Sequence, residues 1–408
     1  MPNPFTSIGS VPLTKLALNA QERADMIAFL QNLVQMPSHS GEEKAAAGLI
    51  KEKLKEVGVA DVSVDRVGNV IAQLGPDTGL TLLMDAHMDT VSPARGSWPH
   101  EPYAGVIEDG YLYGLGSCDM KASIAAMVYA LKRLVKSGAP LNGRLVCAFV
   151  VQEEPCEGGA LEALMEETGI RPDYVLLGEP SDMKVMLGHR GRVMFKVTVR
   201  GRSSHASTPE LGFNAITAAA RLIFGIEMLA ADMASDPFMG PGTIAVTHIE
   251  SEAASLNAVP HACSFHVDRR LTLGETPSRA QSQLEAVLQR EGIDASIEIT
   301  RYTRPSYTGY AFDVLESFDA WAIDPGHKLV QQIKSAVKAV RGQEVTTGHW
   351  PFSTDGVYSM GKANIPTVGF GPGDPHTAHT VNERVRLEDV VQAAQVYGAF
   401  AALTLSTG

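Results

Sequence analysis

The chain has 408 residues, of which 45% are hydrophobic and 20% charged, and its 34 Lys and Arg against 46 Asp and Glu give a formal net charge of −12. This composition is that of an ordinary globular protein of about two to three domains, which excludes a disordered chain and a collagen-like fold. Clustered Lys and Arg, on which affinity for nucleic acid and anionic membranes depends, do not occur. We therefore expect a small-molecule substrate and neither a nucleic-acid nor a membrane partner.

Residues 1–20 contain neither a basic region nor a continuous apolar run, and no later stretch approaches the ~20 apolar residues of a membrane span. The cysteines form no CxxC pair and have no regular spacing, which indicates reduced, buried thiols. They are Cys118, Cys147, Cys156 and Cys263. Together these features predict a cytoplasmic protein.

Predicted helices and strands alternate over the first part of the chain. Apolar residues at helical spacing predict a helix that begins after Asn19 and ends before Pro37, and Asn19 with Glu22 resembles a capping box. A second helix is expected to end at Gly58. The elements expected up to this point and beyond are helices 42–57 and 120–135 and strands 62–64, 70–74, 80–84, 145–151 and 174–177. This alternation is typical of an α/β sheet layered by helices.

The pattern changes from about residue 188 and returns to helix–strand alternation beyond residue 305. The middle segment has the order βαββαβ of a ferredoxin-like unit. Its expected elements are strands 193–199, 243–249, 262–270 and 295–300 and helices 213–231 and 277–291. The last part is expected to contain a helix at 328–340, a strand at 367–370 and a helix from 387, while 304–326 has no clear assignment. We predict one domain of residues 1–187 and 303–408, interrupted by a domain of residues 188–302.

Several common catalytic motifs are excluded by their spacing. Gly114-Leu115-Gly116 begins like a dinucleotide fingerprint, but Asp119 occupies the third glycine position and would face a pyrophosphate. His100-Glu101 begins like HExxH, but Ala104 replaces the second histidine. Neither a GxSxG elbow nor a GxxxxGK[ST] loop is present. The sequence therefore argues against four classes of protein: Rossmann dinucleotide-binding enzymes, zincins, serine hydrolases and P-loop nucleotide-binding proteins.

A histidine and an aspartate follow the apolar run 80–84. In extended chain His87 and Asp89 point the same way, so His87 could face a metal while Asp89 holds its tautomer. If this pair is considered alone, a histidine that merely makes ordinary hydrogen bonds at a polar strand end explains it equally well. Asp119 stands at the start of a predicted helix, where a role as N-cap would be sufficient.

Three further polar segments each follow a predicted strand. Glu153 and Glu154 are adjacent carboxylates, which repel each other and do not lie on a solvated helix face. Glu179 directly follows the next strand, and a glycine-rich turn leads to His379. His376 could compete with His379, but we assign it to solvent or to a position behind the ligands. Because ligands in open α/β folds bind beyond the carboxyl ends of the strands, we expect all these segments to meet there.

Two histidines and three carboxylates suit Zn, Co or Mn better than Ca, which prefers oxygen, or Cu(I), which prefers sulfur. Five ligands are too many for one tetrahedral ion with an open position. They suit two divalent ions roughly 3.5–4 Å apart that share a carboxylate and a water. Such a centre also needs a general base that is not a ligand, and Glu153 is the natural candidate.

The order of the blocks HxD, GxGxxDxK, EE, GEP and GPG…AHxxNE resembles the M20 family of metallopeptidases and amidohydrolases. This family includes acetylornithine deacetylase, succinyl-diaminopimelate desuccinylase, aminoacylase and glutamate carboxypeptidase. The resemblance covers essentially the whole chain. It implies an α/β fold, in which a zinc-peptidase-like catalytic domain with a mixed sheet between helices is interrupted by a ferredoxin-like α+β lid domain.

The resemblance also implies a role for each matching residue. It makes His87 and Glu179 ligands of one metal, Glu154 and His379 ligands of the other, and Asp119 the bridge. Asp89 becomes the partner of His87, and Glu153 the base that activates the water. In the lid, His205 corresponds to a histidine that polarises the scissile carbonyl, in dimeric members from the neighbouring subunit. Asn257 and Arg270 match positions that bind the substrate's backbone and carboxylate, and strand alternation separates Arg270 from Arg269.

We therefore expect a dinuclear metal-dependent hydrolase that cleaves an amide bond in a small N-acyl amino acid or a short peptide with a free carboxylate. Lid closure should complete the site, and a homodimer through the lid is expected. A ureido or carbamoyl amidohydrolase or an aminopeptidase with the same metal centre is the alternative. A non-catalytic metal-binding or small-molecule-binding homologue is the alternative of another class, although such a protein usually loses the base.

Overall fold

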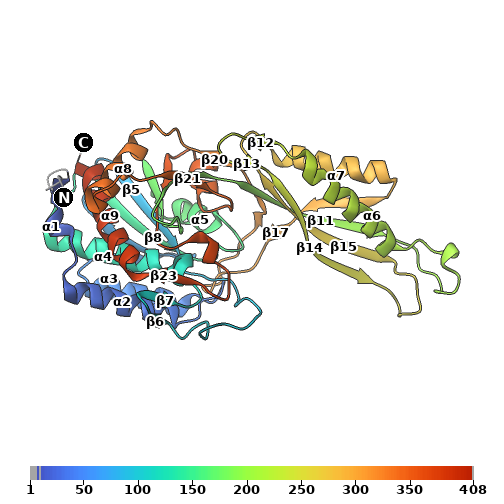
Figure 1. The fold of residues 1–408 in the computed structure, drawn as a ribbon, viewed down its shortest axis with the longest axis horizontal. Coiled ribbons are helices and arrows are strands. Elements are labelled where there is room, and N and C mark those ends of the chain that lie inside the picture. The colour runs from blue at the N-terminus through green and yellow to red at the C-terminus, as the bar shows by residue number, and fades with distance from the viewer. Residues whose placement is uncertain (1–6, 9–10, 407–408) are drawn as a thin grey trace.

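A mixed sheet of nine strands forms the centre of the larger of two bodies (Figure 1). The computed structural model describes residues 7–8 and 11–406. Across the sheet the strands are β20 (Trp321–Ala322), β10 (Val185–His189), β22 (Thr367–Gly369), β9 (Tyr174–Leu177), β5 (Thr81–His87), β8 (Arg144–Val150), β4 (Val70–Leu74) and β3 (Asp61–Val64), with β21 (Thr347–Trp350) also paired to β10. Strands β22, β9, β5 and β8 are parallel, so their carboxyl ends meet at one edge.

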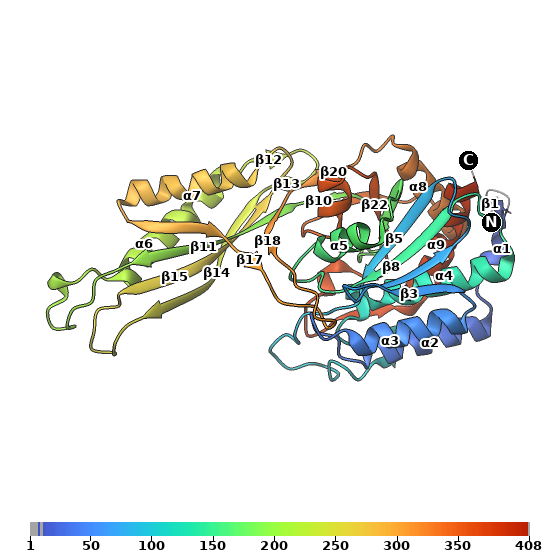
Figure 2. The ribbon, with the colours of Figure 1, turned by 180° about the vertical axis from the view of Figure 1, so that it is seen from behind.

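The parallel strands are buried apolar runs, as expected for strands covered on both faces. Helices α4, α8 and α9 pack together over one face of the sheet, and α5 lies on the other side (Figure 2). The helices of this body are α1 (Leu13–Leu16), α2 (Ala20–Val34), α3 (Lys44–Glu56), α4 (Ala122–Ser137), α5 (Gly159–Thr168), α8 (Lys328–Arg341) and α9 (Leu387–Ser406). A smaller sheet of β23 (Arg384–Arg386), β7 (Tyr111–Tyr113) and β6 (Val106–Glu108) and a hairpin of β1 (Ser7–Ile8) and β2 (Val11–Pro12) complete it.

The elements predicted from periodicity are confirmed, including the capping box, in which Asn19 and Glu22 exchange hydrogen bonds at the start of α2. Strands β4 and β9 have the predicted bounds. Helix α5 and strand β10 were not predicted. The sequence of β10 contains Gly188 and runs directly into the next strand, so no turn signal separates the two.

The second body is a five-stranded antiparallel sheet with helices α6 (Ala215–Met228) and α7 (Pro277–Glu291) on one face (Figure 1). Its strands lie in the order β14 (Thr243–Glu252), β15 (Ala262–Leu271), β11 (Gly191–Arg200) and β16 (Ala295–Ile299), and β19 (Ser317–Phe318) also pairs with β11. This strand order and the βαββαβ sequence confirm the ferredoxin-like lid. A hairpin of β12 (Ser235–Asp236) and β13 (Gly240–Pro241) precedes β14.

The chain passes from one sheet to the other at Arg190, which separates β10 from β11. It returns through residues 300–320, where β17 (Arg301–Tyr302) pairs with β18 (Val314–Leu315). The division into residues 1–187 with 303–408 and residues 188–302 stays a prediction, and residues 1–6, 9–10 and 407–408 lie outside the described residues. All four cysteines are free and buried. Among the helices of the described chain, none combines the length and the apolar character that crossing a membrane requires.

Candidate metal centre

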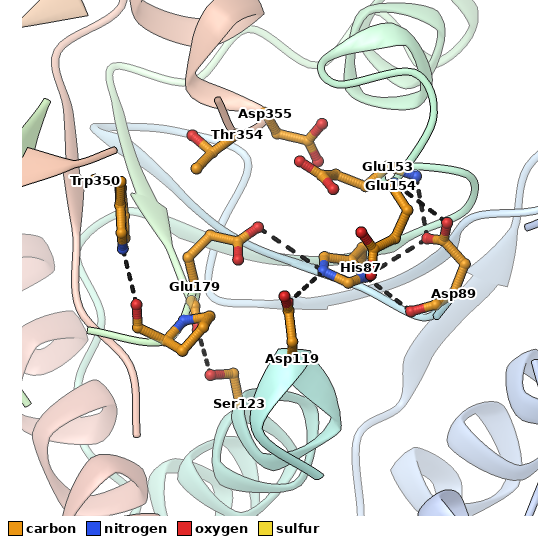
Figure 3. A network of polar contacts seen from close by, with 12 residues as sticks. His87, Asp89, Asp119, Ser123, Glu153, Glu154, Glu179, Trp350, Thr354 and Asp355 are labelled. Atoms are coloured by element: carbon orange, nitrogen blue, oxygen red, sulfur yellow. Dashed lines mark hydrogen bonds and ion pairs between the residues drawn. The ribbon is translucent and has the colours of Figure 1, made fainter. Parts of the chain in front are cut away.

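His87 is the last residue of β5, at the carboxyl edge of the parallel strands, and its side chain is 1% exposed. Its Nδ1 lies 3.0 Å from the backbone oxygen of Asp89 and 3.5 Å from the Asp89 carboxylate. A neutral imidazole that donates through Nδ1 presents Nε2 as an acceptor. Nε2 points into the site, 3.0 Å from Asp119 Oδ1 (Figure 3). The backbone of Asp89 therefore contributes to orienting this ring together with the carboxylate.

Asp119 lies in an irregular turn, Ser117–Lys121, that precedes α4. The N-cap explanation of this residue is wrong, because the residue at the N-cap of α4 is Lys121 and no side chain caps the helix there. The turn is held by Glu383, whose Oε1 accepts the backbone N–H groups of Cys118 and Asp119 at 3.1 Å each. The sequence motif that contains His379 also contains Glu383, but its contact with the turn could not be inferred from spacing.

The two oxygens of Asp119 face two different histidines. Oδ1 lies 3.0 Å from His87 Nε2, and Oδ2 lies 3.3 Å from His379 Nε2. His379 Nε2 is also 3.0 Å from the Glu154 carboxylate, and His87 Nε2 is 3.9 Å from Glu179 Oε1. A carboxylate between two imidazoles has the geometry of a ligand shared by two cations.

Glu153 and Glu154 follow β8, and their backbone N–H groups donate to the two oxygens of Asp89 at 3.0 and 3.3 Å. Glu153 is 5% exposed, and its Oε1 is buried without a hydrogen-bond donor among the described residues. Such a buried, unpartnered oxygen is costly unless something else binds it. Its place beside the histidine–carboxylate cluster is visible in Figure 3.

Glu179 follows β9, and the adjoining backbone is held on two sides (Figure 3). Ser123 donates to the Gly178 carbonyl, and Trp350 Nε1 donates to the Pro180 carbonyl at 2.8 Å. The glycine-rich turn after β22 approaches the same backbone, because a Cβ on Gly371 would lie 2.3 Å from the Gly178 oxygen. Glycine at this position therefore allows the turn that carries His379 to reach the site.

His376 is exposed and pairs with Asp374, as predicted for a residue that faces solvent. His379 has a φ of 60° and lies at the rim, with its side chain 47% exposed.

The predicted cluster lines a cavity of about 450 Å³ between the two bodies. Asp119, Glu153, Glu154, Glu179 and His379 form one wall. The lid contributes Arg270 and Arg192, and Glu157 and Ser353 complete the polar lining. Arg192 and Glu157 were not singled out from the sequence, because neither belongs to a block of the resemblance.

The alternation of side chains along β15 decides which of the adjacent Arg269 and Arg270 faces the cavity. Arg269 is 1% exposed and pairs with the buried Glu275, on the face of the sheet away from the cavity. Arg270 lines the cavity, and its guanidinium binds both oxygens of Asp268 at 2.7 and 3.0 Å. The structure therefore places Arg270, and not Arg269, beside the cluster.

The other two lid residues lie elsewhere. His205 and Asn257 are exposed in loops of the lid and do not line this cavity within one chain. They lie near each other, because Ala206 N donates to the Asn257 oxygen at 2.8 Å. His205 Nδ1 contacts Ser207 Oγ at 2.6 Å.

The charges of the cluster favour a bound cation. Burial raises the pKa of Glu153 and Glu179, and the neighbouring carboxylates raise it further. Burial also acts to raise the pKa of Asp119, but His379 and His87, when protonated, donate hydrogen bonds to it and lower its pKa below the usual range. Two overlapping groups, His87–Asp119–Glu154 and His87–Glu153–Glu179, have potential ligand atoms within 4.8 Å of one another. Imidazole and carboxylate donors suit borderline divalent metals.

Residues 83–403 match the model of peptidase family M20/M25/M40. The uncharacterized protein YgeY of Escherichia coli strain K12 is 35% identical over 400 residues, which cover 98% of this chain and 99% of YgeY. The succinyl-diaminopimelate desuccinylase of Alkalilimnicola ehrlichii is 30% identical over 364 residues, covering 86% of this chain and 91% of that protein.

A solved M20 family metallo-carboxypeptidase of Sulfolobus solfataricus has a TM-score of 0.75 at 18% identity and covers 94% of this chain and 99% of its own. The aminopeptidase PepT of Bacillus cereus has a TM-score of 0.70 at 22% identity, with 93% of this chain and 98% of its own covered. At these identities the two structures establish the shared fold. Together with the family match, the cluster of histidines and carboxylates shows that the chain belongs to peptidase family M20/M25/M40 and is a metal-dependent amide hydrolase.

Proposed function

We propose that the protein is a dinuclear hydrolase that cleaves an amide bond in a small N-acyl amino acid or a short peptide with a free carboxylate. The observation that carries this proposal is the position of Asp119 between two histidines, with Glu153 in the same cavity and its Oε1 without a hydrogen-bond donor among the described residues. In this proposal His87, Glu179, Glu154, His379 and Asp119 would hold the metal ions, His87 and Glu179 on one side of Asp119 and Glu154 and His379 on the other. Zinc suits these donors, and cobalt or manganese could replace it.

When bound, the metal ions would supply Lewis acidity to the scissile carbonyl and lower the pKa of an attacking water. Glu153 takes the proton from that water and returns it to the leaving amine, which is the ordinary work of a general acid–base residue. Asp89 holds this residue in place through the Glu153 backbone N–H. Arg270 binds the free carboxylate of the substrate from the lid side of the cavity.

His205 and Asn257 can reach a substrate only from a second subunit or after a large movement, because both are exposed in the lid and outside the cavity of their own chain. We therefore propose a homodimer through the lid. Two features support it: helix α6 exposes Ile216, Phe224 and Met228, and the outer edge of β14 pairs with no strand of the described chain. Sedimentation velocity should show a dimer, which F224E combined with M228E should dissociate.

The four free thiols suit a reducing compartment, which supports a cytoplasmic location.

The proposed reaction is tested by release of primary amine from a pooled panel of N-acyl amino acids and dipeptides. Metal-stripped protein should be inactive, and Zn, Co or Mn should each be tried for restoring activity. Separating the pool then identifies the acyl group and side chain. Metal-dependent turnover of ureido or carbamoyl compounds, or of peptides that need only a free amino terminus, would replace the proposed substrate class while keeping the metal centre. Metal binding without turnover of any of these would indicate a binding protein.

A further inference from the structure

An ion pair joins the lid to the loop that carries Glu153. Glu157 lies four residues after Glu153, separated from α5 by Gly158, and is 6% exposed. Its carboxylate accepts from Arg192 Nη2 at 2.9 Å and from Ser353 Oγ at 2.7 Å. Arg192 is the second residue of β11, just beyond the crossing into the lid. The contact therefore connects the two bodies at the wall of the metal cavity.

The loop from Glu153 to Gly158 is fixed at both ends by carboxylates of the larger body. Glu153 N donates to Asp89 at 3.0 Å, and Gly158 N donates to Asp355 at 2.6 Å. Inside the loop, Cys156 N donates to the Glu153 oxygen at 2.9 Å. Within this short, internally bonded loop Glu157 contacts Arg192 of the lid, so the lid contact and the Glu153 backbone belong to one bonded segment.

Arg192 is also held firmly on the lid side. It lies 3.6 Å from Glu316, and its guanidinium is 5.4 Å from the centre of the Phe318 ring. In the sheet it is directly opposite Arg270. Like charges opposite each other on neighbouring strands are unfavourable unless each is neutralised. Arg270 has Asp268 as its partner, whereas Arg192 is neutralised by Glu157 at 2.9 Å across the gap between the bodies and by Glu316 at 3.6 Å.

We infer that Arg192 and Glu157 are positioning residues for hydrolysis: their ion pair couples the position of the lid to the position of the Glu153 carboxylate. The inference rests on the proposed role of Glu153. Buried ion pairs contribute little net stability, because desolvation offsets their attraction, but they fix one geometry. A displacement of ~1 Å at a reacting group can cost on the order of 10²-fold in rate. The pair therefore acts on turnover more than on folding.

The kinetic test compares R192Q, R192K, E157Q and the double variant R192Q/E157Q. R192Q and E157Q, which each remove one partner of the ion pair, should lower kcat by about 10- to 100-fold and change KM by less than about threefold. Their metal content should equal that of the wild type. R192K should recover part of kcat, because it keeps the charge but loses the second hydrogen-bonding arm. The double variant should be no slower than either single variant, because both act through one contact.

The matched control is R301Q. Arg301 is another arginine near the crossing, ion-paired to Asp313 on the surface, and it does not line the metal cavity. R301Q should keep the wild-type kcat. Multiplicative losses in the double variant, loss of metal from R192Q, or an equal loss in R301Q would each overturn the inference.

A second measurement needs no turnover. Spin labels on A45C in α3 and S282C in α7 report the distance between the two bodies, since both positions are exposed and all native cysteines are buried. R192Q should shift or broaden the distance distribution, and R301Q should leave it unchanged. An R192Q distribution identical to that of the parent overturns the coupling. If the wild type hydrolyses nothing while R192Q alters the distribution, the proposed function fails and the coupling stands.

Discussion

Asp89 Oδ1 accepts the backbone N–H of Glu153 at 3.0 Å. The same carboxylate lies 3.5 Å from His87 Nδ1, so one buried side chain contacts both the first histidine of the cluster and the loop that carries the proposed base. Asp89, which follows β5, therefore contacts Glu153, which follows β8, and these two strands are parallel neighbours. Asp89 therefore positions residues from two neighbouring strands without itself lying at the reacting atoms.

Glu153→Gln should abolish most hydrolysis while metal remains bound. Gln has the shape of Glu but cannot take a proton, and general acid–base groups contribute about 10²- to 10⁴-fold to rate. We expect kcat to fall within that range at unchanged metal content, measured by amine release and elemental analysis. E162Q, which changes an α5 carboxylate ion-paired to Lys362 outside the metal cavity, is the control and should be active. Intact hydrolysis by metal-loaded E153Q would show that the mechanism is wrong.

Asp119→Ala should lose more metal than His379→Ala. Asp119 faces both histidines, whereas His379 contacts only the half of the cluster that contains Glu154. We expect close to two ions per chain in the wild type, about one in H379A and less than one in D119A, measured by elemental analysis after dialysis against a weak chelator. Equal stoichiometry in the two variants would contradict a shared carboxylate.

Arg270→Gln and Arg269→Gln should have different effects. For R270Q we expect KM for a substrate with a free carboxylate to rise about 10- to 100-fold, because hydrogen bonds to charged groups contribute about 1.5–3 kcal/mol. The KM for the same substrate with its free carboxylate replaced by an amide should change little in R270Q. R269Q leaves Glu275 buried without its partner and should destabilise the lid by about 3–5 kcal/mol. Steady-state kinetics and urea unfolding separate the two; a selective KM effect in R269Q would reverse the assignment.

Glu22→Gln should reduce stability at neutral pH and not in acid. Burial acts to raise the pKa of Glu22, but hydrogen bonds from Lys136 and the Asn19 backbone and the Arg133 charge outweigh it, so the pKa lies below its usual 4.5. A lowered pKa gives stability that is present above the unfolded-state pKa and is lost as the pH falls through the folded-state pKa.

At pH 7 we expect E22Q to lower the free energy of unfolding by about 1–2 kcal/mol, from the loss of a cap and of charge-assisted hydrogen bonds. The difference from the wild type should shrink as the pH falls below 4.5. Urea unfolding at several pH values measures both. The control is E52Q, which removes the exposed ion pair between Glu52 and Lys55 on α3. It should change the free energy of unfolding by less than about 0.5 kcal/mol at every pH. A constant E22Q effect across the series would exclude the ionised carboxylate as its cause.

The sequence by itself determined most of the longer helices and strands and the residue types of the site. Local signals are sufficient for these: the Asn19–Glu22 capping box starts α2, and apolar runs place β4 and β9 within their bounds. Polar residues directly after buried strands indicated His87 and Glu179, because parallel strands end at a common edge. Helix α5 was not predicted because it is a ten-residue segment that begins at two glycines, and β10 was not predicted because no turn signal separates it from the next strand.

Only the tertiary structure decided which residues meet. It placed Asp119 between two histidines, removed its N-cap explanation and separated Arg270 from Arg269. It also brought Arg192 against Glu157, which lie 35 positions apart and on different bodies. Contacts of this kind depend on how strands pair and how one body is set against the other, and both are fixed by packing over the whole chain. No local pattern of residue types records them.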